Sequence, residues 1–307
     1  MHLEEGWICL LRVPPVKISR PEITPSPKEF LWPKLLTRKF LGYGLLGLAS
    51  LFALAPLWQI TVFALEPANS IGIKGWRWPA AAHFDNFFLL LTTTGFIRWV
   101  ANSFLVALAV TAVGLILSTT AGYAISRFRF FGRVAVLSGL LLTQIFPATM
   151  LLLPIFLILV QWQLINTFFG LGIIYLATVL PFNIWQMKSF YDSVPENLEE
   201  IAAMDGCSPS QIFRLVILPI SAPGLAVTAL FTFAAVWNEY VVASILLQDI
   251  DRLTLPLGLN LLHGEGAAGQ PGLFAAGALL VTIPMLVLYL LLSRFLLERV
   301  RDITIRH

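Results

Sequence analysis

Long apolar stretches are the feature that most limits how this chain can fold. One of them is interrupted by Pro181 and Asn183. A proline is nevertheless tolerated in a membrane helix where neighbouring helices provide a donor for the backbone carbonyl that the proline leaves unbonded. About 20 apolar residues in a helix are enough to cross the ~30 Å hydrocarbon layer of a bilayer. We therefore expect an all-α membrane protein with six transmembrane helices. The six stretches are residues 40–65, 99–125, 134–160, 167–187, 219–247 and 272–297.

The composition agrees with this class. Hydrophobic residues make up 58% of the chain and charged residues 12%, whereas a soluble domain carries about 25% charged residues. The net charge of +3 does not indicate a nucleic-acid partner, because the basic residues stand at the edges of the apolar stretches and not along one soluble face. The chain is expected to contact membrane lipid and no nucleic acid.

Basic residues are distributed unevenly between the two sides of the predicted membrane. Six spans place both ends of the chain on one side, and that side holds sixteen of the 20 Lys and Arg residues. Cytoplasmic loops carry the excess of Lys and Arg. Both termini and the loop 193–219 are therefore predicted to be cytoplasmic. We interpret Arg127, Arg129 and Arg133 as membrane-edge anchors of this kind.

The first 39 residues differ from the rest of the chain. They interleave six prolines with charged residues, a composition that resists packing into a core. Two glutamates and the lack of a clear apolar run at the start argue against a secretory signal peptide. Residues 1–39 are thus expected to form a flexible cytoplasmic leader, and residues 40–307 a transmembrane domain.

A charged segment with the sequence signals of short helices lies between the fourth and fifth apolar stretches. We call this segment, residues 195–219, the island. Ser193 and Glu196 have the spacing of a capping box, which marks a helix start. Gly206 can adopt the left-handed conformation that ends a helix. The pattern predicts a short helix that stops near Asp205, followed by a sharp turn. A polar island of this kind in a membrane protein predicts a soluble partner.

The two helices of the island have distinct sequence signals. Ser208, Pro209 and Gln211 repeat the start signal after the glycine. In the first helix, one predicted face combines apolar side chains with a single carboxylate. Its members are Leu198, Ile201, Ala202 and Asp205.

The island resembles the cytoplasmic "EAA" loop of ABC-importer permeases, whose pattern is Glu-Ala-Ala, two variable residues and Asp-Gly, with Ile, Leu and Pro downstream. Ile201 stands where the first alanine is usual, and Cys207 replaces a common alanine. The residues that match are Glu200, Ala202, Asp205, Gly206, Ile217, Leu218 and Pro219. The resemblance implies docking to a separate ATPase through Glu200, Ile201, Ala202, Asp205 and Gly206.

A second resemblance lies in the fifth apolar stretch. Residues Trp237-Asn238-Glu239-Tyr240 are similar to the Trp-Asn-Glu-aromatic signature of carbohydrate-type ABC permeases. Polar side chains at membrane depth are costly and normally face a bundle interior or water. Asn238, Glu239 and Tyr240 would hydrogen-bond sugar hydroxyls while Trp237 stacks on a sugar face. The alternative is that Glu239 braces a neighbouring helix without touching substrate.

Similarity to maltose-type permeases extends over about residues 99–300. The matching segments are Trp99–Phe104, Tyr123–Arg133, Gln144–Pro147 and Leu164–Thr167. Gln144 and Asn183 are further polar candidates for a substrate pathway, although a helix–helix hydrogen bond is the favoured interpretation of both.

The resemblance implies one half of a heterodimeric sugar channel in a prokaryotic cell membrane. Its partners would be a second permease, two cytoplasmic ATPase subunits that use ATP and Mg, and an extracytoplasmic sugar-binding protein. The chain has no Gly-x-x-x-x-Gly-Lys-Ser/Thr phosphate loop, so it cannot supply the ATPase site itself. Its four histidines are far apart in sequence, and no metal, cofactor or catalytic site is expected.

Three other functions stay open. The chain would also suit an ABC importer of a non-sugar solute. An ion-coupled secondary transporter would need intramembrane ionisable groups, and Glu239 alone is predicted at depth. A scaffold or a partner in polysaccharide synthesis would copurify with no ATPase.

Overall fold

The computed structural model describes residues 32–67, 82–145, 150, 152–263 and 270–305, and these residues are almost entirely helical. In chain order the elements are α2 (Trp32–Leu65), α3 (Asp85–Thr93), α4 (Phe96–Arg127), α5 (Arg133–Thr143), α6 (Leu152–Gln161), α7 (Phe168–Ser193), α8 (Asn197–Met204), α9 (Pro209–Gln211), the π-helix η2 (Ile212–Ile217), α10 (Leu218–Ile220), α11 (Ala222–Trp237), α12 (Val241–Leu246), the 3-10 turn η3 (Ile250–Arg252), α13 (Leu255–His263) and α14 (Pro271–Ile305). The predicted all-α class is confirmed for these residues. Most of the predicted leader, residues 1–31, lies outside them.

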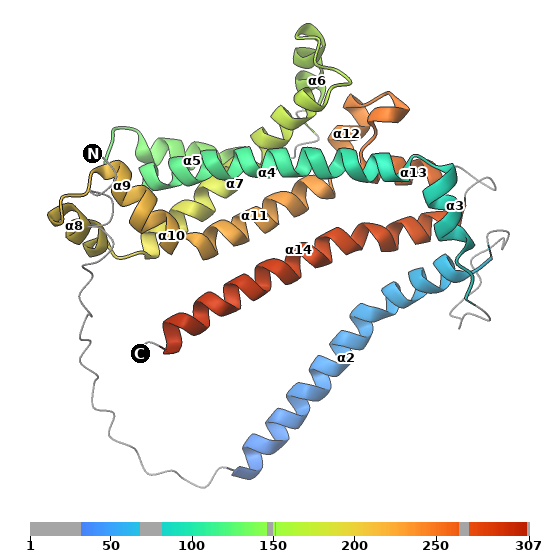
Figure 1. The fold of residues 1–307 in the computed structure, drawn as a ribbon, viewed down its shortest axis with the longest axis horizontal. Helices are drawn as coiled ribbons and strands as arrows, with labels where there is room; N and C mark the ends of the chain where they lie inside the picture. Colours follow the sequence, from blue (N-terminus) through green and yellow to red (C-terminus); the bar gives the residue numbers. More distant parts are fainter. Residues whose placement is uncertain (1–31, 68–81, 146–149, 151, 264–269, 306–307) are drawn as a thin grey trace, which may run out of the picture.

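Helix α4 runs along one side of the bundle, and α14 and α2 lie beyond α11 on the side away from it (Figure 1). Helices α7 and α11 pack on α4 and on each other, while α14 packs on α11 and α2. Short helices α8, α9 and α10 gather at one end of the bundle, and α3 and α13 gather at the other. The start of α2 and the end of α14 lie toward the end that carries α8 (Figure 1).

The described helices account for up to five of the six predicted spans. Four are long and apolar enough to cross a membrane, within α2, α4, α7 and α14, and the segments 209–220 and 222–237 form a fifth if they are taken as one span bent by 71°. The predicted third span, 134–160, is instead divided into α5 and α6, of 11 and 10 residues. Residues 146–149 and 151 between them lie outside the described part.

The fifth span is shorter than predicted. Helix α11 ends at Trp237, not near residue 247. The Asn238 amide donates to the Ala234 carbonyl at 2.8 Å. The Glu239 carboxylate accepts two N–H groups of α12, which a continuous helix would donate to backbone carbonyls. The Glu239 carboxylate thus takes the place of two backbone acceptors, and Glu239 lies in a helix break and not inside a helix.

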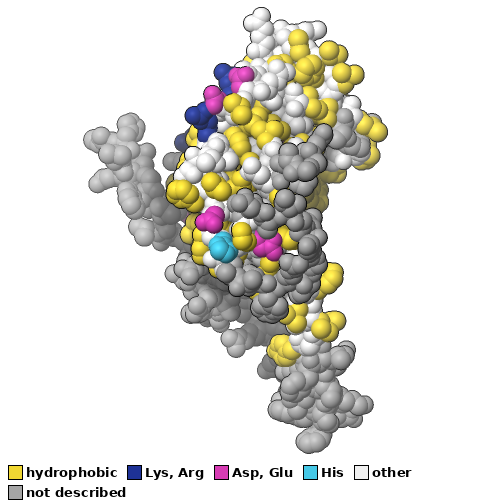
Figure 2. All heavy atoms as spheres, turned by 90° about the vertical axis from the view of Figure 1, so that its right-hand side faces the viewer, with side chains coloured by type: hydrophobic (Ala, Val, Ile, Leu, Met, Phe, Trp, Pro, Cys, Tyr) yellow, Lys and Arg dark blue, Asp and Glu magenta, His cyan; other side chains and the backbone are white. Residues whose placement is uncertain are grey.

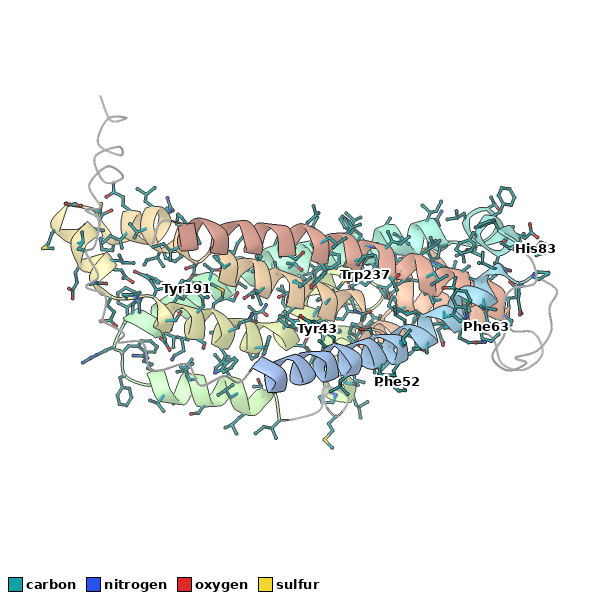
Figure 3. The ribbon with its side chains drawn as sticks, turned by 90° about the horizontal axis from the view of Figure 1, so that it is seen from below. Tyr43, Phe52, Phe63, His83, Tyr191 and Trp237 are labelled. Atoms are coloured by element: carbon teal, nitrogen blue, oxygen red, sulfur yellow. The ribbon has the colours of Figure 1, made fainter. Side chains whose placement is uncertain are left out.

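Two buried apolar clusters hold the bundle together. The larger one surrounds Trp237 and fills the space between α4, α7, α11, α13 and α14. The smaller one surrounds Tyr191 at the end that carries α8, and Figure 3 shows these two side chains well apart along the bundle. Hydrophobic side chains on α2, among them Tyr43 and Phe52, are exposed, as befits a helix that faces lipid or another membrane subunit.

Helices α4 and α7 approach closely near Gly122. A Cβ atom at this position would lie 2.9 Å from Met187 Cβ and 3.0 Å from the Lys188 backbone nitrogen. Further along α7, the buried Asn183 amide donates to Thr232 Oγ1 of α11 at 2.8 Å. Small residues and interhelical hydrogen bonds are the usual means of helix packing in a bilayer.

We predict that Gly122→Ala destabilises the protein, because the added methyl group meets backbone that cannot move away. Such overpacking costs about 1–3 kcal/mol, and the melting temperature of the detergent-purified protein should fall. Gly139→Ala in α5 is the matched control, since a Cβ there meets nothing within 4 Å and alanine is the better helix former. Equal melting temperatures for the two variants would contradict this account of the α4–α7 contact.

Candidate functional site

Helix α8 and the turn that follows it have the predicted form. Glu199 and Glu200 lie in the first turn, where their negative charges interact favourably with the positive end of the helix dipole. The helix ends at Met204, and Gly206, two residues later, has a φ of +86°. There the Gly206 N–H donates to the Ala203 carbonyl at 3.0 Å, and the next N–H donates to the Ala202 carbonyl at 3.1 Å. A left-handed glycine therefore closes α8 and turns the chain sharply.

The two predicted capping boxes have different outcomes. Ser208 and Gln211 form one, and the Ser208 N–H donates to Gln211 Oε1 at 2.7 Å. The box predicted from Ser193 is wrong. Its hydroxyl donates to the Phe190 carbonyl at 2.6 Å, so it belongs to the last turn of α7, and α8 begins only at Asn197.

The predicted docking residues are divided between the interior and the surface. Ala202 is buried and Leu198 is partly buried against the smaller cluster, which includes Ile212 and Ile217 of η2. Ile201 is half-buried. We call the outer edge of α8 the exposed edge; Met204 on it is 80% exposed. Its members are Glu200, Ala203, Met204, Asp205 and Gly206.

A π-helix joins this region to α11. It covers Ile212–Ile217 and precedes Pro219, which has no N–H to donate to the Leu215 carbonyl. The Ser221 hydroxyl donates to the Ile217 carbonyl at 2.7 Å, and the chain then bends by 71° into α11. The segment that carries α8 is therefore connected to a membrane helix through a fixed bend.

The second candidate site is the break after α11. The Tyr175 hydroxyl of α7 donates to Glu239 Oε2 at 2.7 Å. The N–H groups of Val242 and Ala243 donate to the same carboxylate at 2.8 and 3.2 Å. One carboxylate thus links α7, the break and α12, which is the bracing arrangement considered above.

The neighbours of Glu239 differ in their exposure. Trp237 is completely buried and stacks on Phe233 at 5.6 Å between ring centroids. Asn238 and Tyr240 are exposed, and the Tyr240 hydroxyl accepts a hydrogen bond from the Asn260 amide at 3.0 Å. The surface of the break therefore offers an amide and a phenol, with the tryptophan behind them.

Gln144 and Asn183 both form contacts between helical segments. Gln144 Nε2 donates to the Thr178 carbonyl at 3.3 Å, one turn before Pro181 in α7. Asn183 bonds Thr232, as described above. Among the residues that the structure describes, no three His, Cys, Asp or Glu side chains are placed to hold a metal ion.

The opposite end of the bundle contains polar contacts that sequence reasoning missed. The Asn102 amide donates to the carbonyls of residues 251 and 253 at 3.0 and 2.9 Å, and Ser103 Oγ accepts the N–H of residue 255 at 2.7 Å. Asn166 Oδ1 accepts the N–H groups of residues 248 and 249. Figure 2 looks onto this end and shows basic and acidic side chains side by side near its upper edge. We call residues 248–255 the end segment; its anchors lie in the motifs Trp99–Phe104 and Leu164–Thr167.

Comparison with known proteins places the chain in a family. The model of the binding-protein-dependent transport system inner membrane component matches residues 113–302. The maltodextrin permease protein of Bacillus subtilis is 31% identical over 84% of this chain and 93% of its own length. The galactooligosaccharides permease protein of the same organism is 32% identical over 84% and 92%. The trehalose permease protein of Mycobacterium tuberculosis is 32% identical over 79% and 89%.

The chain therefore belongs to the family of inner-membrane permeases of carbohydrate ABC importers. It is a permease subunit of a binding-protein-dependent importer and not the ATPase, which sets aside the scaffold and ion-coupled alternatives. The fold agrees with that of a bacterial ABC transporter that imports the acidic polysaccharide alginate. One chain of its crystal structure matches with a TM-score of 0.72 at 24% identity, over 88% of this chain and 99% of that one.

We predict that Glu239→Ala lowers the melting temperature and solute uptake together. The substitution leaves two N–H groups and the buried Tyr175 hydroxyl without their acceptor, at about 1–3 kcal/mol for each unsatisfied buried group. Glu239→Gln keeps one acceptor oxygen and should recover part of both losses. Thermal unfolding of the purified protein and uptake by proteoliposomes provide the two readouts. Lower uptake at an unchanged melting temperature would contradict bracing and favour direct substrate contact.

Proposed function

We propose that this chain forms half of the translocation pathway of an ATP-driven importer of di- or oligosaccharides. The observation that carries the proposal is the exposed edge of α8. Glu200 and Asp205 lie at the surface there, while the inner side of the same helix packs against the smaller apolar cluster of this permease. The names of the three relatives described above refer to maltodextrin, galactooligosaccharides and trehalose. The Trp237–Tyr240 segment adds support for a sugar over another solute, because it combines aromatic and polar groups.

In this proposal the exposed edge of α8 docks into a cleft of a cytoplasmic ATPase. Glu200 and Asp205 provide charge at the two ends of the helix, and Met204 provides apolar contact. Ala202 seats the inner face of α8 on η2, and η2 continues through the bend into α11. Closure of two ATPase subunits around ATP and Mg would therefore shift α8 and α11 together.

The break after α11 is proposed to line the pathway, together with a second permease of the same family. Asn238 and Tyr240 are exposed and suited to hydrogen-bond sugar hydroxyls, while Glu239 and Trp237 hold them in place. Gln144 and Asn183 would support the pathway helices without contacting the sugar. An extracytoplasmic binding protein would deliver the sugar at the end that carries the end segment, with both termini of this chain in the cytoplasm.

The function can be tested on the complex purified through a tag on this chain from its native membrane. We expect an ATPase and a second permease to copurify. In proteoliposomes with the binding protein, labelled maltodextrin, galactooligosaccharide or trehalose should enter only with ATP. Labelled amino acids and dipeptides are the controls. Uptake of those controls in place of every sugar would contradict the sugar proposal, and uptake without ATP would contradict the importer mechanism.

We predict that Gly206→Val abolishes sugar uptake while the chain still inserts into the membrane. The reason is conformational, because a Cβ here meets nothing within 4 Å whereas φ is +86°. A β-branched residue in the left-handed region costs about 1–2 kcal/mol and would reorient the end of α8. Gly206→Asn is the matched control, since asparagine tolerates this conformation. Wild-type uptake by the valine variant would contradict the role of this turn in coupling.

A further inference from the structure

Arg127 at the end of α4 has a specific contact inside the chain. Its Nε donates to Glu199 Oε1 of α8 at 2.5 Å, and its Nη2 donates to the Val194 carbonyl at 2.8 Å. The side chains of Arg127 and Glu199 are 9% and 17% exposed. Glu196, also near Arg127 at 3.9 Å, is 77% exposed. The arginine thus holds both α8 and the turn that leads into it.

This arrangement is unlike that of a membrane-edge anchor. An anchor keeps its charge in the water or headgroup layer, as exposed Arg129 does; within the described part of the chain Arg129 has no ion pair. Burial of a charge is costly unless a partner compensates it. Arg127 and Glu199 neutralise each other. Because both side chains are largely buried, each charge is stable at its position only while the other is present.

An aromatic contact surrounds the ion pair. The Tyr123 hydroxyl, one turn back on α4, donates to Glu199 Oε2 at 2.9 Å. The Tyr123 ring lies 4.8 Å from that of Phe213 in η2 and 5.6 Å from that of Tyr191 in α7. Both oxygens of Glu199 therefore bond to α4, while the same tyrosine contacts the two elements that carry α8.

The other end of α4 is also fixed. Asn102 and Ser103 hold the end segment there, and Arg98 forms an ion pair with Asp251. The helix has 32 residues, which corresponds to about 48 Å at 1.5 Å per residue. A single straight helix thus has polar contacts to α8 at one end and to the end segment at the other.

We propose that the Arg127–Glu199 ion pair is the joint through which movement of α8 reaches α4 and, along it, the end segment. This deepens the proposed function and rests on it. The bend into α11 provides one connection between α8 and the membrane helices, and the ion pair provides a second, to a different helix. Arg127 and Glu199 are positioning residues, and Glu200 is left free to meet the ATPase.

The test compares three variants of the whole purified complex in proteoliposomes. Glu199→Gln removes the acidic charge and leaves Arg127 without its counter-ion. Arg127→Gln combined with Glu199→Gln removes both charges, so that no unpaired charge is buried. Arg129→Gln is the control, because it removes one positive charge two residues from Arg127, at an exposed position. Each complex is measured for ATP hydrolysis with the binding protein and for import of labelled maltodextrin, galactooligosaccharide or trehalose, whichever the wild type carries.

We expect the doubly neutral complex to assemble and to hydrolyse ATP within about twofold of the wild-type rate, while sugar imported per ATP falls at least tenfold. Arg129→Gln should keep the wild-type ratio. A wild-type ratio in the doubly neutral complex would overturn the proposal. Failure of that complex to assemble with its ATPase would also overturn it, by assigning the pair to folding. If the wild-type complex itself imports no sugar with ATP, the proposed function fails instead.

Discussion

A backbone N–H or C=O group in hydrocarbon has no water to bond, and this requirement decides where the membrane helices of this permease can break. After α11 the chain can break because the Glu239 carboxylate accepts hydrogen bonds from two N–H groups of α12. The Asn238 side chain also donates a hydrogen bond to a carbonyl in the last turn of α11. Near Pro181 in α7, Gln144 bonds a carbonyl in the preceding turn. The break after α11 is thus matched by two polar side chains, which make their hydrogen bonds within the chain.

At the other end of the bundle, two residues with unusual backbone properties set the direction of the segment that carries α8. Gly206 turns the chain after α8 with a positive φ, and Pro219 follows a π-helix that leads into a 71° bend. Their effect is to fix the orientation of α8 relative to α11, which an ATPase docked on the exposed edge would then inherit.

Much of the fold follows from patterns that a sequence displays directly, and the rest depends on contacts between distant residues. Apolar length predicted the long helices, and the glycine and the Ser208 box predicted the turn after α8. The Ser193 box failed because a serine at the junction of two helices can bond backward as readily as forward. Hydropathy placed Glu239 inside a helix because it does not register side-chain capping. Arg127 was interpreted as an anchor because its partner Glu199 is 72 residues away.

The anchors of the end segment also impose an order on biosynthesis. Asn102 bonds carbonyls that lie 149 and 151 residues later in the chain, and Ser103 bonds an N–H 152 residues later. Helix α4 is therefore synthesised long before the groups that its end will hold. The hydrogen bonds at this end of the permease can therefore form only after α11 and α12 have been synthesised.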